Sequence, residues 1–254
     1  MRRLSGKVAF ITGGGTGIGR ACALAFAREG ANLAIVGRRP EPLASVVKEI
    51  EASAGEAIAL ACDVTDRATV QTALDKAEQN FGQLNIVVNN AGVAVVATAE
   101  ATSDEDWNRI LTTNLTGTFL VSRAALPALR RAGGGTILNI GSILGIVARK
   151  NRAAYCAAKA GVGGLTRAMA LDHAADKIRV NCICPSIVET ELGLQVMSKN
   201  PDAHAEREKR IAEIPIGRLG TPDDVAMMAV YLASDEAAWI TGASFPLDGG
   251  LTAY

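Results

Sequence analysis

The 254-residue chain carries 26 basic and 26 acidic residues, so its formal net charge is zero, and this balance argues against a nucleic-acid partner or charge-driven binding to anionic membranes. Hydrophobic residues make up 49% and charged residues 20%, which is typical of a folded globular protein and excludes a disordered one. The N-terminal basic residues precede only a short apolar run before glycines, which does not fit a signal peptide, so we expect a cytoplasmic protein.

Short apolar runs alternate with amphipathic or alanine-rich segments along the chain. The pattern predicts strands at Val8–Thr12, Asn32–Val36, Ala57–Ala61, Asn85–Val88, Thr136–Ile140, Arg179–Cys184 and Ala243–Leu247. It predicts helices near 18–29, 41–53, 67–80, 104–131, 153–174 and 222–233. Continuous apolar strands separated by helices indicate an α/β fold, a Rossmann-type doubly wound parallel sheet of about seven strands with helices on both faces.

The first strand is followed directly by a glycine-rich turn that opens the first helix, in the stretch VAFITGGGTGIGRACALAFAREG. Glycine permits a tight turn and a close approach of the backbone to a pyrophosphate, while the helix N-terminus offers free N–H groups to phosphate. A tight turn alone also needs glycine, but the strand–turn–helix context predicts a dinucleotide site. Its expected contacts are Gly13, Thr16, Gly17, Ile18 and Gly19. Since no linker, low-complexity tract or internal repeat divides the chain, we interpret residues 1–254 as a single NAD(P)-binding domain.

The end of the second strand bears on the choice of nicotinamide cofactor. NAD-binding folds usually place an acid there for the ribose 2′-OH, whereas this chain has Gly37 followed by Arg38 and Arg39. An arginine can hold a 2′-phosphate bidentately, so NADP(H) is favoured and NAD(H) stays possible. Two observations keep the question open: Thr16 is not basic, and the two arginines can also belong to a solvated turn before Pro40.

An uncharged stretch of 21 residues, Gln79–Ala99, raises the question of a membrane helix. Several amide side chains within it would need partners in lipid, which favours a buried strand and its following loop. The five cysteines contain no CxxC pair, and without a histidine cluster nearby we expect free thiols in a reducing compartment and no metal site.

The stretch AAYCAAKAG places Tyr155 and Lys159 four residues apart, on one face of the predicted helix. An ammonium beside a phenol favours the phenolate, which suits a group that must exchange a proton at neutral pH. Tyrosine and lysine are also common on helices, so the pair alone does not establish catalysis.

Taken together, these motifs resemble the short-chain dehydrogenase/reductase family, and the resemblance covers almost the whole chain. The glycine spacing is TGxxxGxG, Asn89–Gly92 matches the NNAG motif, and the C-terminal stretch RLGTPDDVAMMAVYLASDEAAWITGASFPLDGG is similar to the branch that includes 3-oxoacyl-acyl-carrier-protein reductases. The resemblance implies four catalytic residues: Asn114, Ser142, Tyr155 and Lys159. It implies that Tyr155 exchanges the substrate proton, that Lys159 assists it and bonds the nicotinamide ribose, that Ser142 holds the carbonyl oxygen and that Asn114 orients a relay water.

The same resemblance implies further cofactor contacts at Asp63, Val64, Asn90, Ala91, Gly92, Tyr155, Lys159, Pro185, Ile187, Val188 and Thr190. One departure lies after the sixth strand, where the family often has Pro-Gly and this chain has Pro185-Ser186. Serine restricts the backbone more than glycine does and adds a hydroxyl.

The segment near 187–214 is polar and longer than an ordinary connection, which predicts a lid over the substrate; a surface helical pair or a subunit contact is the alternative. Between Ser142 and Tyr155 lie Arg149, Lys150 and Arg152, which either attract an anionic substrate or form an ordinary solvated rim.

The sequence thus predicts an NAD(P)(H)-dependent oxidoreductase that interconverts a small-molecule secondary alcohol and a ketone. A 3-oxoacyl-acyl-carrier-protein reductase is the first alternative, although Leu171 stands where carrier-using relatives tend to place an arginine. A non-catalytic nucleotide-binding protein is the second. Family members of this size usually form homotetramers through the helices near 104–131 and 153–174 and the C-terminal edge; the alanines on those helices could instead pack on the sheet.

Overall fold

A computed structural model describes residues 2–197 and 202–253. Within them, seven strands form one parallel sheet in the order β3-β2-β1-β4-β5-β6-β7. The strands are β1 (Val8–Thr12), β2 (Asn32–Gly37), β3 (Ala57–Ala61), β4 (Ile86–Asn89), β5 (Gly135–Ile140), β6 (Ile178–Pro185) and β7 (Ser244–Leu247). The predicted fold class is confirmed, and each strand end lies within one residue of its predicted position.

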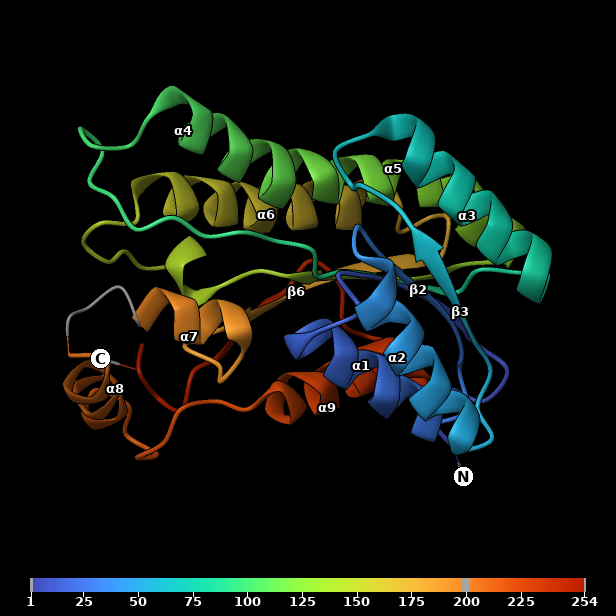
Figure 1. Cartoon of the computed structure of the whole chain (residues 1–254). Coiled ribbons are helices and arrows are strands. Elements are labelled where there is room, and N and C mark those ends of the chain that lie inside the picture. The colour runs from blue at the N-terminus through green and yellow to red at the C-terminus, as the bar shows by residue number, and fades with distance from the viewer. Residues whose placement is uncertain (1, 198–201, 254) are drawn as a thin grey trace.

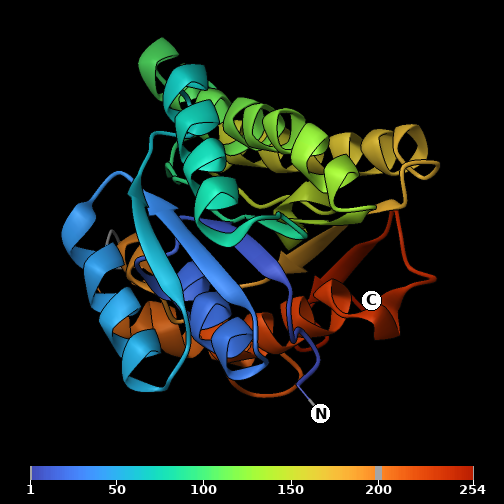
Figure 2. The same ribbon diagram turned by 90° about the vertical axis from the view of Figure 1, so that its right-hand side faces the viewer.

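Helices cover both faces of this sheet (Figure 1). One layer contains α1 (Gly17–Arg28), α2 (Pro40–Ala52) and α9 (Pro222–Ala233). The other contains α3 (Arg67–Phe81), α4 (Asp104–Leu111), α5 (Gly117–Arg131) and α6 (Ala153–Asp172). Two further helices, α7 (Glu191–Met197) and α8 (Ala203–Ala212), lie at one end of the molecule. Figure 2 shows the same three layers from the side.

The pleat of the central strands explains why both faces are covered. In β1, Ala9 and Ile11 belong to the core under α1 and α9, whereas Val8 and Phe10 belong to the core under α3 and α5. Since successive side chains point to opposite faces, an uninterrupted apolar strand buries apolar groups on both sides. The two apolar cores follow from this alternation.

The predicted helix near 104–131 is continuous but not uniform. Residues Thr112–Thr116 form a π-helical turn between α4 and α5, which the sequence analysis did not anticipate. Such turns insert one extra residue into a helix and are frequent at functional sites. Asn114 lies in this turn, so the irregularity coincides with a predicted catalytic residue.

The uncharged stretch Gln79–Ala99 contains the end of α3, the buried strand β4 and the loop that follows it. No helix in residues 2–197 and 202–253 is long and apolar enough to cross a membrane.

The strand order places a topological switch point between β1 and β4. From β1 the chain proceeds outward to β2 and β3, and then returns to β4 on the other side of β1. Ligands of open α/β sheets bind at the carboxyl ends of the strands where this reversal occurs. The glycine turn after β1 and the Asn89–Gly92 stretch after β4 both lie at that point.

Candidate functional site

The glycine turn is a backbone cradle that tolerates no side chain at key positions. Gly13 and Gly17 have φ angles of 64° and 53°, in the left-handed region that favours glycine. A Cβ on Gly19 would lie 2.2 Å from the carbonyl oxygen of Gly13. Glycine at these positions therefore lets the turn fold tightly onto the start of α1, at the helix N-terminus that a pyrophosphate would approach.

The NNAG stretch holds the glycine turn from the neighbouring strand. Asn90 donates from Nδ2 to the carbonyl oxygens of Thr12 (3.0 Å) and Gly13 (3.2 Å). In return, the Thr12 hydroxyl oxygen accepts from the backbone N–H groups of Asn90 and Ala91, at 3.0 and 3.1 Å. Asn89 points elsewhere and bonds Ser122 and Asn139, both at 2.8 Å. Of the two asparagines, only Asn90 shapes the cleft.

A cavity of about 400 Å³ extends from the glycine turn towards the end of β2. The predicted cofactor contacts that line it are Gly13, Thr16, Gly17, Ile18, Arg38, Arg39, Asp63, Val64, Asn90, Ala91, Gly92 and Thr190. Arg38 and Arg39 are exposed at its far end, and Arg39 approaches Glu191 at 3.9 Å. These residues fit a nicotinamide dinucleotide, because the cavity joins a phosphate cradle to two cations.

The carboxylate of Asp63 is held in its ionised form. Burial opposes its ionisation, but hydrogen bonds from the backbone N–H and the hydroxyl of Thr65, at 2.9 and 2.8 Å, outweigh burial. The positive charge of Arg38 acts in the same direction, and the pKa of Asp63 is lowered. This end of the cavity therefore combines an ionised acceptor with the positive charge of Arg38.

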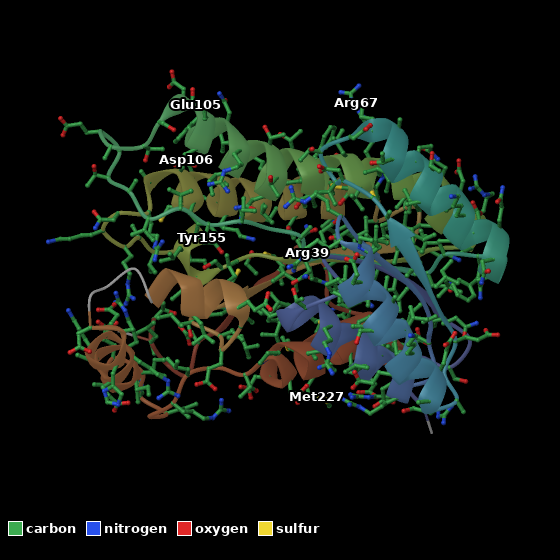
Figure 3. All side chains as sticks on the ribbon, in the orientation of Figure 1. Arg39, Arg67, Glu105, Asp106, Tyr155 and Met227 are labelled. Atoms are coloured by element: carbon green, nitrogen blue, oxygen red, sulfur yellow. The ribbon has the colours of Figure 1, made fainter. Side chains whose placement is uncertain are left out.

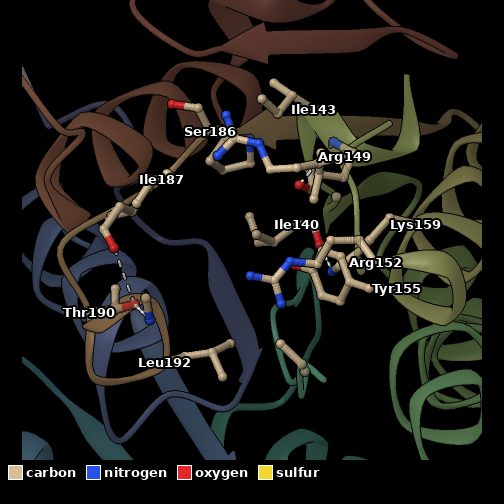
Figure 4. A pocket seen from close by; sticks show the side chains of 18 of the residues that line it. Ile140, Ile143, Arg149, Arg152, Tyr155, Lys159, Ser186, Ile187, Thr190 and Leu192 are labelled. Atoms are coloured by element: carbon tan, nitrogen blue, oxygen red, sulfur yellow. Dashed lines mark hydrogen bonds between the residues drawn. The ribbon is translucent and has the colours of Figure 1, made fainter. Parts of the chain in front are cut away.

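A second cavity, of about 540 Å³, contains the predicted catalytic wall. Ser142, Tyr155 and Lys159 all line it, and Figure 4 shows the last two. Lys159 is only 7% exposed, its Nζ lies 5.7 Å from the centre of the Tyr155 ring, and it donates to the carbonyl oxygen of Ile140 at 2.7 Å. The i,i+4 spacing thus does place both side chains in one cavity, and a strand-end carbonyl holds the ammonium there.

Asn114 stands behind this wall rather than on it. It is buried, accepts at Oδ1 from the backbone N–H of Val93 (2.8 Å) and donates from Nδ2 to the carbonyl oxygen of Val93 (2.9 Å). Its own carbonyl oxygen accepts from the hydroxyl of Thr118 at 2.8 Å. Asn114 and Gly19 are the two predicted site residues that line neither cavity.

The loop after β6 closes the third side of the cleft. The predicted cofactor contacts Pro185, Ile187, Val188 and Thr190 line the larger cavity, and Ser186 lines it too. Ser186 has no positive φ, and its backbone N–H donates to the carbonyl oxygen of Leu247 at 3.2 Å. Serine therefore occupies this position without backbone strain.

The two cavities are parts of one cleft, because they share lining residues, among them Ile18, Asn90 and Thr190. Figure 3 labels both ends of this cleft, with Arg39 beside α2 and Tyr155 at the start of α6. One end offers a cradle and cations, and the other offers a phenol, a hydroxyl and an ammonium.

Comparisons with known proteins agree with this geometry. A family model described as "Enoyl-(Acyl carrier protein) reductase" matches residues 13–252. The chain is 41% identical to 2-(S)-hydroxypropyl-CoM dehydrogenase 3 of Xanthobacter autotrophicus over 252 residues, which cover 99% of this chain and 98% of that protein. It belongs to the short-chain dehydrogenase/reductase family.

Other relatives of this short-chain dehydrogenase/reductase show the breadth of the family. The chain is 37% identical to the 3-oxoacyl-(acyl-carrier-protein) reductase FabG of Thermotoga maritima, across 98% of this chain and 99% of that protein. The crystal structure of a short-chain type dehydrogenase/reductase from Mycobacterium marinum matches with a TM-score of 0.92 and 38% identity, covering 99% of this chain and 97% of that one. The chain is therefore an NAD(P)(H)-dependent oxidoreductase that transfers a hydride between nicotinamide and a secondary alcohol or ketone.

Some residues that line the cleft of this short-chain dehydrogenase/reductase were not predicted. Leu251 reaches the larger cavity from the far C-terminus, and Arg210 and Glu206 reach it from α8. For Arg210 and Glu206, the only signal in the sequence was the length of the polar 187–214 segment. No motif or spacing in the sequence indicated Leu251. These residues come from segments that meet the site only through the tertiary fold.

Proposed function

We propose that Ser142, Tyr155 and Lys159 carry out the reaction, with Tyr155 as the general acid and base, and that Asn114 positions the cavity wall from behind. One observation carries the assignment: the buried Lys159 ammonium is held 5.7 Å from the centre of the Tyr155 ring by its bond to the Ile140 carbonyl. A bound nicotinamide supplies or accepts the hydride. The protein must then move a proton at the substrate oxygen, and the Tyr155 hydroxyl is the group in the cavity suited to that transfer.

Ser142 and Asn114 complete the proposed arrangement. The Ser142 hydroxyl oxygen already accepts from the backbone N–H of Leu144 at 3.1 Å, so its own hydrogen is left to donate to a substrate oxygen. Asn114 holds Val93, a residue that lines both cavities, in place through two backbone bonds. Lys159 would also hold the nicotinamide ribose.

The test is absorbance at 340 nm with NADPH or NADH and a panel of ketones and 3-oxoacyl esters. We expect Tyr155→Phe to lower kcat by about a hundredfold to ten-thousandfold, because the proton donor is lost, while the affinity for the cofactor is retained. Full activity in Tyr155→Phe would refute the mechanism. Tight cofactor binding with no turnover of any ketone or alcohol would favour a non-catalytic nucleotide-binding protein.

The same substrate panel tests the alternative function, that of a 3-oxoacyl-acyl-carrier-protein reductase. The similarity to the Thermotoga maritima enzyme supports this alternative. Leu171 is 82% exposed on α6, so an apolar side chain faces outward where we expected carrier-using relatives to place an arginine. A preference for simple ketones over 3-oxoacyl esters would exclude this alternative.

We infer that NADP(H) is the preferred cofactor. The smaller cavity is lined at the end of β2 by Gly37, Arg38 and Arg39, with no acid in the position that usually accepts a ribose 2′-OH. Arginine matches the geometry of a phosphate, which supports the choice of the phosphorylated cofactor. Equal or tighter binding of NADH would overturn it.

We propose that the chain is one domain whose 187–214 segment acts as a lid. Support comes from its described parts: Leu192 and Gly193 of α7 and Glu206 and Arg210 of α8 line the larger cavity. Residues 198–201 lie outside the described residues. If the segment is a lid, protease cleavage within it will slow when cofactor and substrate are added together; an unchanged cleavage rate would favour the surface-pair alternative.

We propose a homotetramer in the cytoplasm. Exposed apolar side chains on the α4–α6 layer (Trp107, Phe119 and Leu171) and near the C-terminal edge (Trp239, fully exposed) support two contact surfaces. The described cysteines are all free, which fits a reducing compartment. Sedimentation at monomer mass would contradict the assembly, and export of the protein from the cell would contradict the compartment.

A further inference from the structure

The mouth of the larger cavity is edged by three arginines. Arg149 and Arg152 come from the loop before α6, and Arg210 comes from α8. Two of them are neutralised within the protein: Arg149 pairs with Glu213 at 2.5 Å, and Arg210 pairs with Glu213 at 3.2 Å and also with Glu206. These pairs hold the loop and α8 together across the mouth.

Arg152 differs from the two paired arginines, because no described carboxylate lies within ion-pair distance of it. Lys150 also lines the cavity without a described carboxylate partner, but it is exposed, whereas Arg152 is half-buried. Within the described part of the chain, its one hydrogen bond runs from Nη1 to the carbonyl oxygen of Val95 at 3.1 Å. Residues 195–201 contain no acid that could serve instead. A half-buried cation without a countercharge is unfavourable unless something else supplies one.

The electrostatic environment of Arg152 also indicates that its positive charge lacks a partner. Burial is the largest cause that lowers the pKa of its guanidinium; the Tyr155 oxygen opposes this, and the positive charges of Arg210 and Arg149 lower it further. Guanidinium groups keep their proton in proteins, so Arg152 stays a cation, and Arg210 and Arg149, which influence it, are already paired with carboxylates. A substrate anion beside Arg152 would supply the countercharge that this guanidinium lacks.

The backbone aims Arg152 at the reacting group. Asn151 has a φ of 62°, in the left-handed region that asparagine tolerates, and its carbonyl oxygen accepts from the N–H of Ala97 at 3.0 Å. Ala97 and Arg152 form a parallel bridge, so two loops hold the arginine. Both Arg152 and Tyr155 line the cavity, and Figure 4 shows the guanidinium pointing into it.

We propose that the substrate is a small secondary alcohol or ketone that carries an oxyanion, and that Arg152 binds this anion while Tyr155 meets the reacting oxygen. After its bond to Val95, the guanidinium keeps further N–H donors that can grip two oxygens of a carboxylate in parallel. The proposal rests on the proposed function, since it assigns the substrate of the same site.

The experiment uses the full chain with saturating NADPH and compares each oxo acid with its neutral ester. The pairs are 3-oxobutanoate with methyl 3-oxobutanoate, and 4-oxopentanoate with methyl 4-oxopentanoate. We expect kcat/KM of the better acid to exceed that of its ester at least about tenfold, and KM of the acid to rise with ionic strength while that of the ester does not.

The variant Arg152→Gln keeps a donor for Val95 and removes the charge. We expect it to lower kcat/KM for the acid by about tenfold to a hundredfold, mainly through KM, and to change the ester by less than about twofold. Arg109→Gln, an exposed arginine of α4, is the matched control. An ester used as well as its acid, or an Arg152→Gln loss that is equal for acid and ester, would overturn the proposal.

Failure of this inference is distinguishable from failure of the proposed function. Suppose that the esters turn over, that Tyr155→Phe abolishes this turnover, and that the acids are not preferred. This result would refute the anion site alone and leave the proposed function intact. If the Tyr155→Phe variant still turns over the esters, the proposed function is refuted. If no compound turns over, calorimetry on the NADP-saturated chain decides, because acid binding that is absent, no tighter than ester binding, or unaffected by Arg152→Gln overturns the anion site.

Discussion

The inner end of the cleft and its outer rim are built in different ways. At the inner end, Lys159, Asn114 and Asn90 each bond main-chain atoms of strand ends or adjoining turns. At the rim, Arg149 and Arg210 bond carboxylate side chains, so charges hold the loop and α8 together.

This difference in construction corresponds to two tasks, catalysis of the reaction and recognition of the substrate. Main-chain anchors belong to the fold and persist whatever the surface composition, whereas ion pairs at an exposed rim can be exchanged one side chain at a time. The inner end is therefore suited to a constant hydride transfer, and the rim is suited to the choice of substrate.

The largest effect should come from exchanging a lysine of each region for methionine. Lys159→Met removes the buried ammonium beside Tyr155, and we expect kcat to fall about a hundredfold or more, because proton transfer and cofactor positioning both suffer. Lys150→Met at the exposed rim is the matched control, with an expected change below about twofold. Similar losses in both variants, measured by steady-state kinetics, would erase the distinction between the regions.

A smaller effect should appear at the adenine end of the cleft, which also depends on charge. We expect Arg38→Ala to weaken NADPH binding about tenfold to a hundredfold and to leave NADH binding nearly unchanged, since only the 2′-phosphate loses its partner. Fluorescence titration measures both constants. Arg20→Ala, which removes an exposed partner of Glu49, is the control. An equal loss for both cofactors would mean that Arg38 does not read the phosphate.

The smallest effect concerns the rim ion pairs themselves. Burial opposes ionisation of Glu213, but Arg149 and Arg210 outweigh it, so the pKa of Glu213 is lowered in the folded chain. Such a group stabilises the fold above its unfolded pKa, and its contribution is lost as the pH falls through the lowered value.

Since its side chain is 31% exposed, we expect Glu213→Gln to cost at most about 1 kcal/mol of unfolding free energy at pH 7. Denaturant unfolding at several pH values should show this difference shrink below about pH 4. The exposed Glu56→Gln serves as control. A difference that persists at low pH would show that packing, not charge, holds Glu213 in place.

Most of the fold was readable from the sequence, because the signals are local. Alternation of apolar strands and helices located the seven strands to within one residue. The π-helical turn at Thr112–Thr116 was not predicted, because one extra residue in a long helix barely changes the apolar pattern by which a helix is recognised. The position of Asn114 behind the cavity wall could not be predicted for the same reason.

The candidate site likewise contains features that the local sequence predicts and features that depend on tertiary contacts. The spacing of Tyr155 and Lys159 and the glycine turn are short-range features, so residue order alone determined that they would present a pair and a cradle. The polarity of the rim depended on tertiary contacts: Arg149 meets Glu213, 64 residues away, while Arg152 lies in the same mouth without a carboxylate. Pairing between distant side chains follows from how loops and helices pack, and no local pattern encodes which cation is left to bind a substrate.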